Sequence, residues 1–248
     1  MFLAHDPSGA PVALKVLHPQ LAVSVTADRF LREISFLREI DHPRIGRLLD
    51  CGESEWLVYY VMGYVDGPNL REHLARVRCA SLSDTQQIAH DLLEALAYAH
   101  AKGIVHRDVK PDNIVLSQHG AVLLDFGIAR AIAESGTDRL TRSGFAVGTS
   151  SYMSPEQVQG LPDIDERSDL YSLGCVLFEC AAGRPPFTAS REELVLRMHL
   201  DSEAPDVRTL RDDISDGLAT LINKALKTRR EDRWQSAEEM RVALRALG

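Results

Sequence analysis

Two short strings in the middle of the chain carry most of the side chains that could do chemistry. The string HRDVKPDN ends at Asn113, and the string DFG begins at Asp125 after two short apolar runs. The carboxylate of Asp108 could act as a base, and the ammonium of Lys110 could neutralise an anionic group. Asn113 and Asp125 offer the hard oxygen ligands that suit magnesium. Together these groups could support phosphoryl transfer, which depends on positioning and on neutralising negative charge.

The two strings, in this order and so flanked, resemble the catalytic loop and the DFG segment of the Hanks-type (eukaryotic-like) serine/threonine protein kinases, particularly the bacterial ones. The resemblance implies that Asp108 accepts the proton of a substrate hydroxyl and that Lys110 reaches the γ-phosphate of ATP. It also implies that Asn113 and Asp125 hold Mg²⁺, with Mn²⁺ as an alternative. Taken singly, either aspartate could simply cap a turn or end a strand; the combination favours catalysis.

The first half of the chain carries residues that could bind a nucleotide. Residues 11–17 (PVALKVL) are apolar and β-branched, which predicts a strand that carries Lys15 as a buried cation in need of a partner. A helix follows, with Thr26 as a plausible N-cap and apolar residues at helical spacing. The resemblance pairs Lys15 with Glu33 on this helix and lets Lys15 hold the α- and β-phosphates. The competing Glu39 is interpreted as a solvated residue.

An apolar run, WLVYYVM, predicts another strand that ends at Met62. The resemblance makes Met62 the gatekeeper of the adenine pocket and lets the backbone from Gly63 to Val65 read the base. The family usually has an acidic residue where Gly63 stands, which matters little for recognition by backbone groups. Ala13 and Val115 would sandwich the adenine ring, an interpretation compatible with simple core packing.

The segment after Asp125 is expected to regulate the enzyme. Residues 134–144 are polar and without periodicity, which predicts a loop. The resemblance places regulatory phosphosites at Thr141 and Ser143, where Arg107 could pair with a phosphate. It also places Thr149 against the catalytic aspartate and lysine, seating the substrate. The plainer interpretation of Thr141 and Ser143 is that they are solvated hydroxyls.

The remaining motifs predict the scaffold. The string SDLYSLGCVLF becomes apolar on all sides, which is typical of a central helix. The resemblance makes its aspartate, Asp169, the anchor of the catalytic-loop backbone and pairs Arg233 with Glu156. Residues 236–239 (SAEE) predict a capping box for the last helix. A stacked spine joining two lobes is expected from Leu37, Leu48, His106 and Phe126, with His106 as a packing residue rather than a base.

Composition agrees with an enzyme domain. The 248 residues are 45% hydrophobic, and the net charge of −8 argues against binding to nucleic acid or acidic membranes. The four cysteines form no CxxC pair, and the remaining histidines show no metal-ligand spacing. With neither a signal peptide nor an apolar run long enough to span a bilayer, we expect a cytoplasmic location. A longer native form could be membrane-tethered.

The expected fold is α+β and two-lobed, like that of protein kinases, with a small antiparallel sheet and one helix before a larger helical lobe. One kinase domain would fill residues 1–248, divided into a truncated N-lobe (1–62), a hinge (63–67) and a C-lobe (68–248). Family members carry a first strand and a Gly-rich loop ahead of the segment that opens this chain. We therefore expect Met1 to reflect an artificial boundary or a misassigned start.

The expected activity is ATP-dependent phosphorylation of serine and threonine on protein substrates, serving signal transduction and regulated by phosphorylation of the loop after Asp125. Dimerisation could allow trans-autophosphorylation. The leading alternative is a catalytically silent kinase-like binding module, because the Gly-rich loop is missing. A small-molecule phosphotransferase is disfavoured by the features of protein kinases at Thr149, at residues 154–156 (SPE) and at Arg233.

Overall fold

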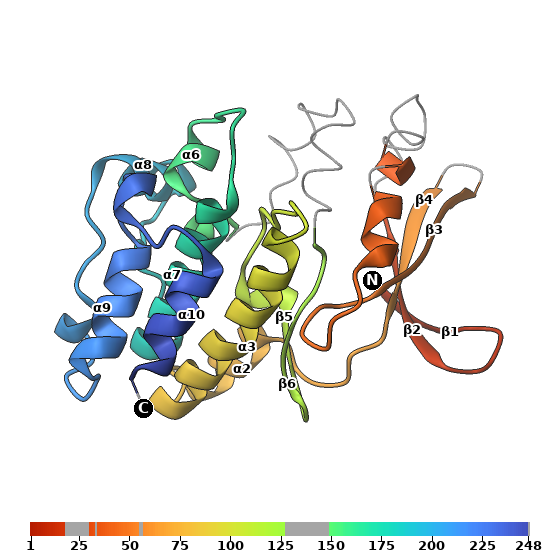
Figure 1. Cartoon of the computed structure of the whole chain (residues 1–248), viewed down its shortest axis with the longest axis horizontal. Coiled ribbons are helices and arrows are strands. Elements are labelled where there is room, and N and C mark those ends of the chain that lie inside the picture. Colours follow the sequence, from red (N-terminus) through yellow and green to blue (C-terminus); the bar gives the residue numbers. More distant parts are fainter. Residues whose placement is uncertain (18–29, 33, 55–56, 127–148, 248) are drawn as a thin grey trace.

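The computed structural model describes residues 1–17, 30–32, 34–54, 57–126 and 149–247. Two parts lie side by side, a β-sheet with a short helical segment and a larger helical part that ends at the C-terminus (Figure 1). The predicted α+β architecture, with a small antiparallel sheet before a larger helical part, is confirmed.

The smaller part is built on a four-stranded antiparallel sheet. In the order in which they lie side by side, the strands are β1 (Phe2–His5), β2 (Pro11–Val16), β4 (Leu57–Gly63) and β3 (Leu48–Ser54). The register sets Ala13 opposite Met62 and Lys15 opposite Tyr60. Because side chains alternate along a strand, Val58, Tyr60 and Met62 share the buried face of β4. The strands predicted around Lys15 and before Met62 are therefore confirmed.

A helical segment covers this sheet. Residues 30–32 and 34–35 are helical, and the 3₁₀-helix η2 (Phe36–Glu39) continues them. Phe30 and Ile34 are fully buried, as the helical spacing of apolar residues predicted. Thr26, the predicted N-cap, lies outside the described residues.

The two parts are joined at the chain segments on either side of β3 and β4. Gly46 donates its N–H to the carbonyl oxygen of Leu123 (2.8 Å), and Leu123 donates to the carbonyl oxygen of Arg44 (2.9 Å). After β4, residues 64–67 have neither helix nor strand. Gly67 has φ of +139°, and a side chain there would collide with the carbonyl oxygen of Leu116.

The larger part consists of helices with one hairpin between the two parts (Figure 1). Its longer helices are α2 (Leu70–Val77), α3 (Leu82–His100), α7 (Glu166–Ala182), α8 (Glu192–Asp201), α9 (Asp216–Ala225) and α10 (Ala237–Arg245). The hairpin is β5 (Ile114–Ser117) with β6 (Gly120–Leu123). Short helical turns are η3 (Pro111–Asn113), η4 (Thr149–Tyr152), α6 (Pro155–Val158), η5 (Val207–Thr209) and η6 (Arg230–Asp232).

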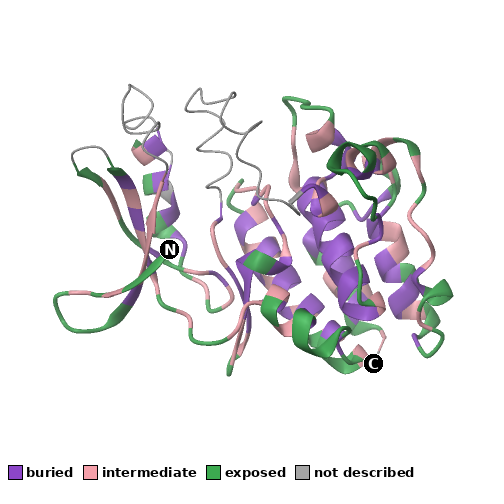
Figure 2. Ribbon diagram, turned by 180° about the vertical axis from the view of Figure 1, so that it is seen from behind, coloured by how far each residue is buried: buried purple, intermediate pink, exposed green. Residues whose placement is uncertain are grey.

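Helix α7 forms the centre of the larger part, as its apolar sequence predicted. Residues 168–181 of this helix are all buried, and Figure 2 shows buried residues concentrated in the helices around it. Gly183 ends the helix in the left-handed conformation (φ +74°). Among the described residues, no helix is long and apolar enough to cross a membrane.

The predicted capping box of α10 is half right. Ser236 accepts a hydrogen bond from the N–H of Glu239 (3.1 Å), as an N-cap should. Glu239, however, accepts from the N–H of Gln235 (2.7 Å) instead of that of Ser236.

Candidate active site

The buried carboxylate of Asp169 holds the backbone of the catalytic loop in place. Its oxygens accept hydrogen bonds from the backbone N–H groups of His106 and Arg107, at 2.8 Å each, as the resemblance implied. His100 at the end of α3 lies 2.8 Å from the same carboxylate. Burial alone would raise the pKa of Asp169, but the contact with His100 and the other hydrogen bonds hold it below its ordinary value.

His106 has a packing role and a defined tautomer. Asp108 donates its backbone N–H to Nδ1 of His106 (3.1 Å), so the proton sits on Nε2, 2.8 Å from the carbonyl oxygen of Leu124. The ring meets Phe126 edge-on at 4.5 Å between centroids. His106 is fully buried, which agrees with the prediction that it packs in the spine and is not a base.

Asp108, Lys110 and Asn113 come together in one cluster. Oδ2 of Asp108 lies 2.8 Å from Nζ of Lys110 and accepts a hydrogen bond from Nδ2 of Asn113 (3.0 Å). The same amide nitrogen donates to the backbone carbonyl of Asp108 (2.9 Å), which leaves Oδ1 of Asn113 as the atom suited to a metal. The Asp108 side chain is 28% exposed, so a substrate hydroxyl could reach it.

Asp125 joins this cluster to the sheet. Its carboxylate forms an ion pair with Lys15 and accepts a hydrogen bond from the hydroxyl of Tyr60 (3.1 Å). Burial and the neighbouring Asp125 carboxylate raise the pKa of Tyr60 well above its ordinary value. Asp125 has φ of +64°, a left-handed conformation that is uncommon away from glycine. The backbone N–H of Leu124 donates to the carbonyl oxygen of Asn113 (2.8 Å), which ties the segment carrying Asn113 to the segment carrying Asp125.

The predicted pairing of Lys15 with Glu33 stays a prediction, and among the described residues Lys15 forms an ion pair with Asp125. Glu33 lies outside the described residues, as do Thr141 and Ser143. Thr149 opens η4, but its side chain is also outside the described part.

The residues expected around adenine line the junction of the two parts. Met62 is buried opposite Ala13, and Val115 is buried on β5. Gly63 donates its N–H to the carbonyl oxygen of Arg47 (2.9 Å). In the part of the chain that the structure describes, no protein group bonds to the backbone N–H or C=O of Val65, which could therefore pair with a base edge.

A small pocket adjoins Met62 and Asp125. It is lined by Leu37, Ile40, Ile45, Gly46, Leu48, Tyr60, Met62, Asp125 and Phe126. The predicted spine residues Leu37, Leu48 and Phe126 thus share one pocket, and His106 contacts Phe126.

The segment beyond the loop is fixed by Glu156. Arg233 donates to both carboxylate oxygens of Glu156, at 2.7 and 2.8 Å, in the bidentate arrangement that the resemblance implied. Burial opposes the charge of Glu156, but the hydrogen bonds from Arg233 and Ser168 hold its pKa below the ordinary value. Tyr152 is tied to α7 because Ser172 donates to its carbonyl oxygen (2.7 Å).

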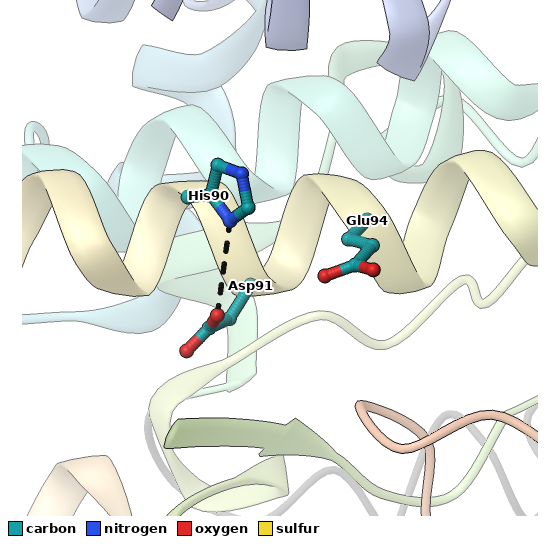
Figure 3. A group of neighbouring side chains, drawn as sticks. All are labelled: His90, Asp91 and Glu94. Carbon is teal, nitrogen blue, oxygen red and sulfur yellow. Dashed lines mark ion pairs between the residues drawn. The ribbon is translucent and has the colours of Figure 1, made fainter. Parts of the chain in front are cut away.

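A second group of titratable side chains lies on α3 (Figure 3). His90, Asp91 and Glu94 are close enough for one ion, a grouping that the sequence analysis missed. The carboxylate of Asp91 is buried and already bonded to Arg44 (3.1 Å) and Gln87 (3.0 Å). This group therefore connects α3 to the segment before β3, and we assign it no ligand.

Sequence reasoning also missed His100 and Tyr60. Tyr60 could have been found from the alternation of β4, which puts it on the same face as Met62. His100 carries no local signal, because its contact with Asp169 depends on how α3 packs against α7.

Comparison with known proteins identifies the class. The protein kinase domain model matches residues 2–243, and the chain belongs to this family. It is 39% identical to the probable serine/threonine-protein kinase SCO3848 of Streptomyces coelicolor, over 99% of this chain and 37% of that protein. It is 41% identical to the serine/threonine-protein kinase PknB of Mycobacterium tuberculosis, over 94% of this chain and 38% of PknB.

The chain thus spans well under half the length of these curated relatives. Membership of the family implies the use of ATP with a divalent metal ion and of protein substrates.

Proposed function

We propose that this chain phosphorylates serine and threonine hydroxyls of proteins with ATP. The relatives named above are serine/threonine kinases, which supports the choice of acceptor. The observation that carries the proposal is the partly exposed carboxylate of Asp108, oriented by Lys110 and Asn113 in a loop fixed to Asp169.

In this proposal Asp108 accepts a hydrogen bond from the substrate hydroxyl, aims its oxygen at the γ-phosphorus and takes its proton. Lys110 neutralises charge that develops on the transferred group. Asn113 and Asp125 would hold Mg²⁺, or Mn²⁺ in its place, through hard oxygen donors that suit either ion. The bound ion would supply neutralisation of the phosphate oxygens.

Lys15 would hold the α- and β-phosphates, with Glu33 as its proposed partner in the nucleotide-bound form. The ion pair between Lys15 and Asp125 supports this proposal. A metal–nucleotide complex offers a cation to Asp125 and phosphate oxygens to Lys15, so each charge would exchange one partner for another. Adenine would lie between Ala13 and Val115, beside Met62, and pair with the backbone from Gly63 to Val65.

We propose the same division of the chain as above, with an N-lobe (1–62), a hinge (63–67) and a C-lobe (68–248). Regulation would act through phosphate on Thr141 or Ser143, paired with Arg107, and Thr149 would help to seat the substrate. Incubation with Mg-ATP followed by mass spectrometry tests the phosphosites, and dilution of the reaction tests transfer between two copies.

The test of catalysis is transfer of labelled phosphate from ATP to a generic protein substrate. Asp108→Asn should abolish transfer and leave the melting temperature within about 3 °C of that of the wild type. Asp201→Asn, a change in an exposed pair with Arg197, is the matched control and should leave transfer unchanged. Undiminished transfer by the Asp108 variant would refute the assigned base. The silent binding module predicts no transfer by the wild type either.

A further inference from the structure

A second buried charge cluster lies next to the catalytic loop and has no part in the chemistry described so far. Arg71 donates through one terminal nitrogen to Oε1 of Glu179 (2.6 Å) and through the other to the hydroxyl of Tyr152. That hydroxyl donates in turn to Oε2 of Glu179. The Glu179 side chain is only 7% exposed, and both its oxygens have a partner.

The three residues come from three elements: α2, η4 and α7. Arg71 sits in the first turn of α2, where the helix dipole disfavours a cation. The Glu179 carboxylate offsets this cost and accounts for the direction in which the guanidinium points. Burial and the adjacent Glu179 raise the pKa of Tyr152, so its hydroxyl stays a donor.

The cluster contacts the catalytic loop through Arg71. Nε of Arg71 lies 3.6 Å from the carboxylate of Asp112, which immediately precedes Asn113 in the catalytic loop. Tyr152 belongs to η4, which Thr149 opens. Arg71 therefore touches both chain segments that would flank the acceptor hydroxyl, and 37% of its side chain is exposed.

The geometry around Glu179 is one that a substrate arginine could satisfy equally well. A forked guanidinium meets one carboxylate oxygen and one hydroxyl. Because Arg71 is covalently part of the chain, it competes at a high effective concentration against any arginine of a peptide. The guanidinium of Arg71 therefore occupies the place beside Glu179 that a substrate arginine could take.

We propose that Arg71 is a specificity-determining residue, which occupies the Glu179 position with its own guanidinium and so denies it to a basic side chain of the protein substrate. This inference rests on the proposed kinase function and specifies its substrate class: acceptor sequences that need no basic residue at the position lying over α2. Removing Arg71 would expose the carboxylates of Glu179 and Asp112 together and create a preference for arginine.

The experiment compares peptide pairs that differ only by arginine or alanine at one position near the acceptor serine. The value of kcat/KM is measured for each pair with the wild type, Arg71→Ala and the double variant Arg71→Ala/Glu179→Gln. Arg71→Ala should raise the arginine-to-alanine ratio by about tenfold at one position, mainly through KM. High salt should shrink this gain, and the double variant should lose it.

Arg208, which pairs with Asp206 and Asp216 on the exposed surface, provides the control, and Arg208→Ala should leave every ratio unchanged. Arg71→Lys keeps the charge without the fork and should stay close to the wild-type ratio. A purely structural role for Arg71 would lower kcat/KM for both members of each pair alike. Ratios that are equal in the wild type and Arg71→Ala would overturn the inference.

Peptide binding separates this inference from the proposed function. Labelled peptides with alanine in place of the acceptor serine are titrated in fluorescence anisotropy, which requires no phosphate transfer. If the wild type transfers no phosphate, the proposed function fails, and tighter binding of the arginine peptide to Arg71→Ala still supports the inference. If Arg71→Ala does not fold, Arg71→Met, which keeps the apolar stem, takes its place. Equal binding of both peptides by the folded variant refutes the inference.

Discussion

Replacing Asp169 by asparagine should detach the catalytic loop from α7. In the wild type, Oδ2 accepts from the N–H of His106 and contacts His100, while Oδ1 accepts from the N–H of Arg107, all at 2.8 Å. An asparagine oriented to keep its oxygen at the Oδ2 position would turn its NH₂ group towards the N–H of Arg107. Arg107 has φ of +68°, a conformation that needs this support, and it directly precedes Asp108.

The size of the effect follows from these contacts. A hydrogen bond to a charged acceptor contributes about 1.5–3 kcal/mol, and a buried N–H left without a partner costs about 1–3 kcal/mol. Asp169 is 1% exposed, so water does not replace the lost acceptor. We therefore expect a loss of roughly 3–5 kcal/mol in the free energy of unfolding, together with at least a hundredfold loss of kcat from the shift of Asp108.

Urea unfolding followed by circular dichroism measures the first quantity, and phosphate transfer measures the second. Because the pKa of Asp169 is lowered in the fold from its ordinary value of 3.8, its stabilisation is present above that pH and is lost as the pH falls through the folded value. The difference between wild type and variant should therefore shrink in acid. Asp201→Asn should change stability by less than about 0.5 kcal/mol. An Asp169 variant with wild-type stability and activity would refute this account of the loop.

Two further changes test the scaffold and the hinge. Arg233→Met should cost about 3–5 kcal/mol in urea unfolding because it leaves the buried Glu156 charge without its bidentate partner, and adding Glu156→Gln should recover part of that loss. A double variant no more stable than the single one would contradict the pairing. Gly67→Ala should cost about 1–3 kcal/mol and weaken ATP binding in calorimetry, since φ is +139° and the new methyl group would meet the carbonyl of Leu116. Gly63→Ala, with its nearest atom 4.0 Å from the added carbon, is the matched control and should be close to neutral in stability; equal losses in the two variants would argue against strain at Gly67.

Local patterns were enough to predict the elements that carry the site. The β-branched run around Lys15 and the run before Met62 became β2 and β4, and the all-apolar string after Asp169 became the buried helix α7. These predictions succeed because backbone hydrogen bonding and side-chain alternation act over a few residues. The roles of Asp108, Lys110 and Asn113, all in one loop, came from the resemblance to the kinase catalytic loop.

Contacts between segments far apart in the sequence could not be predicted from local patterns. Those inferred from the resemblance include Asp169 with the catalytic loop and Arg233 with Glu156, and the structure shows both. The cap at Ser236 shows that even a local motif can use a neighbouring N–H, because Glu239 accepts from Gln235.

The residue types by themselves established that a base, cations, metal-binding oxygens and a central apolar helix are present, because each of these follows from side-chain chemistry or local periodicity. Only the tertiary structure decided which charge meets which: Lys15 with Asp125, His100 with Asp169, and Arg71 with Glu179. A carboxylate and a cation are complementary wherever they occur, so residue type alone cannot rank one pairing above another. The choice depends on how whole helices and the sheet pack, and packing fixes distances that no short stretch of the chain encodes.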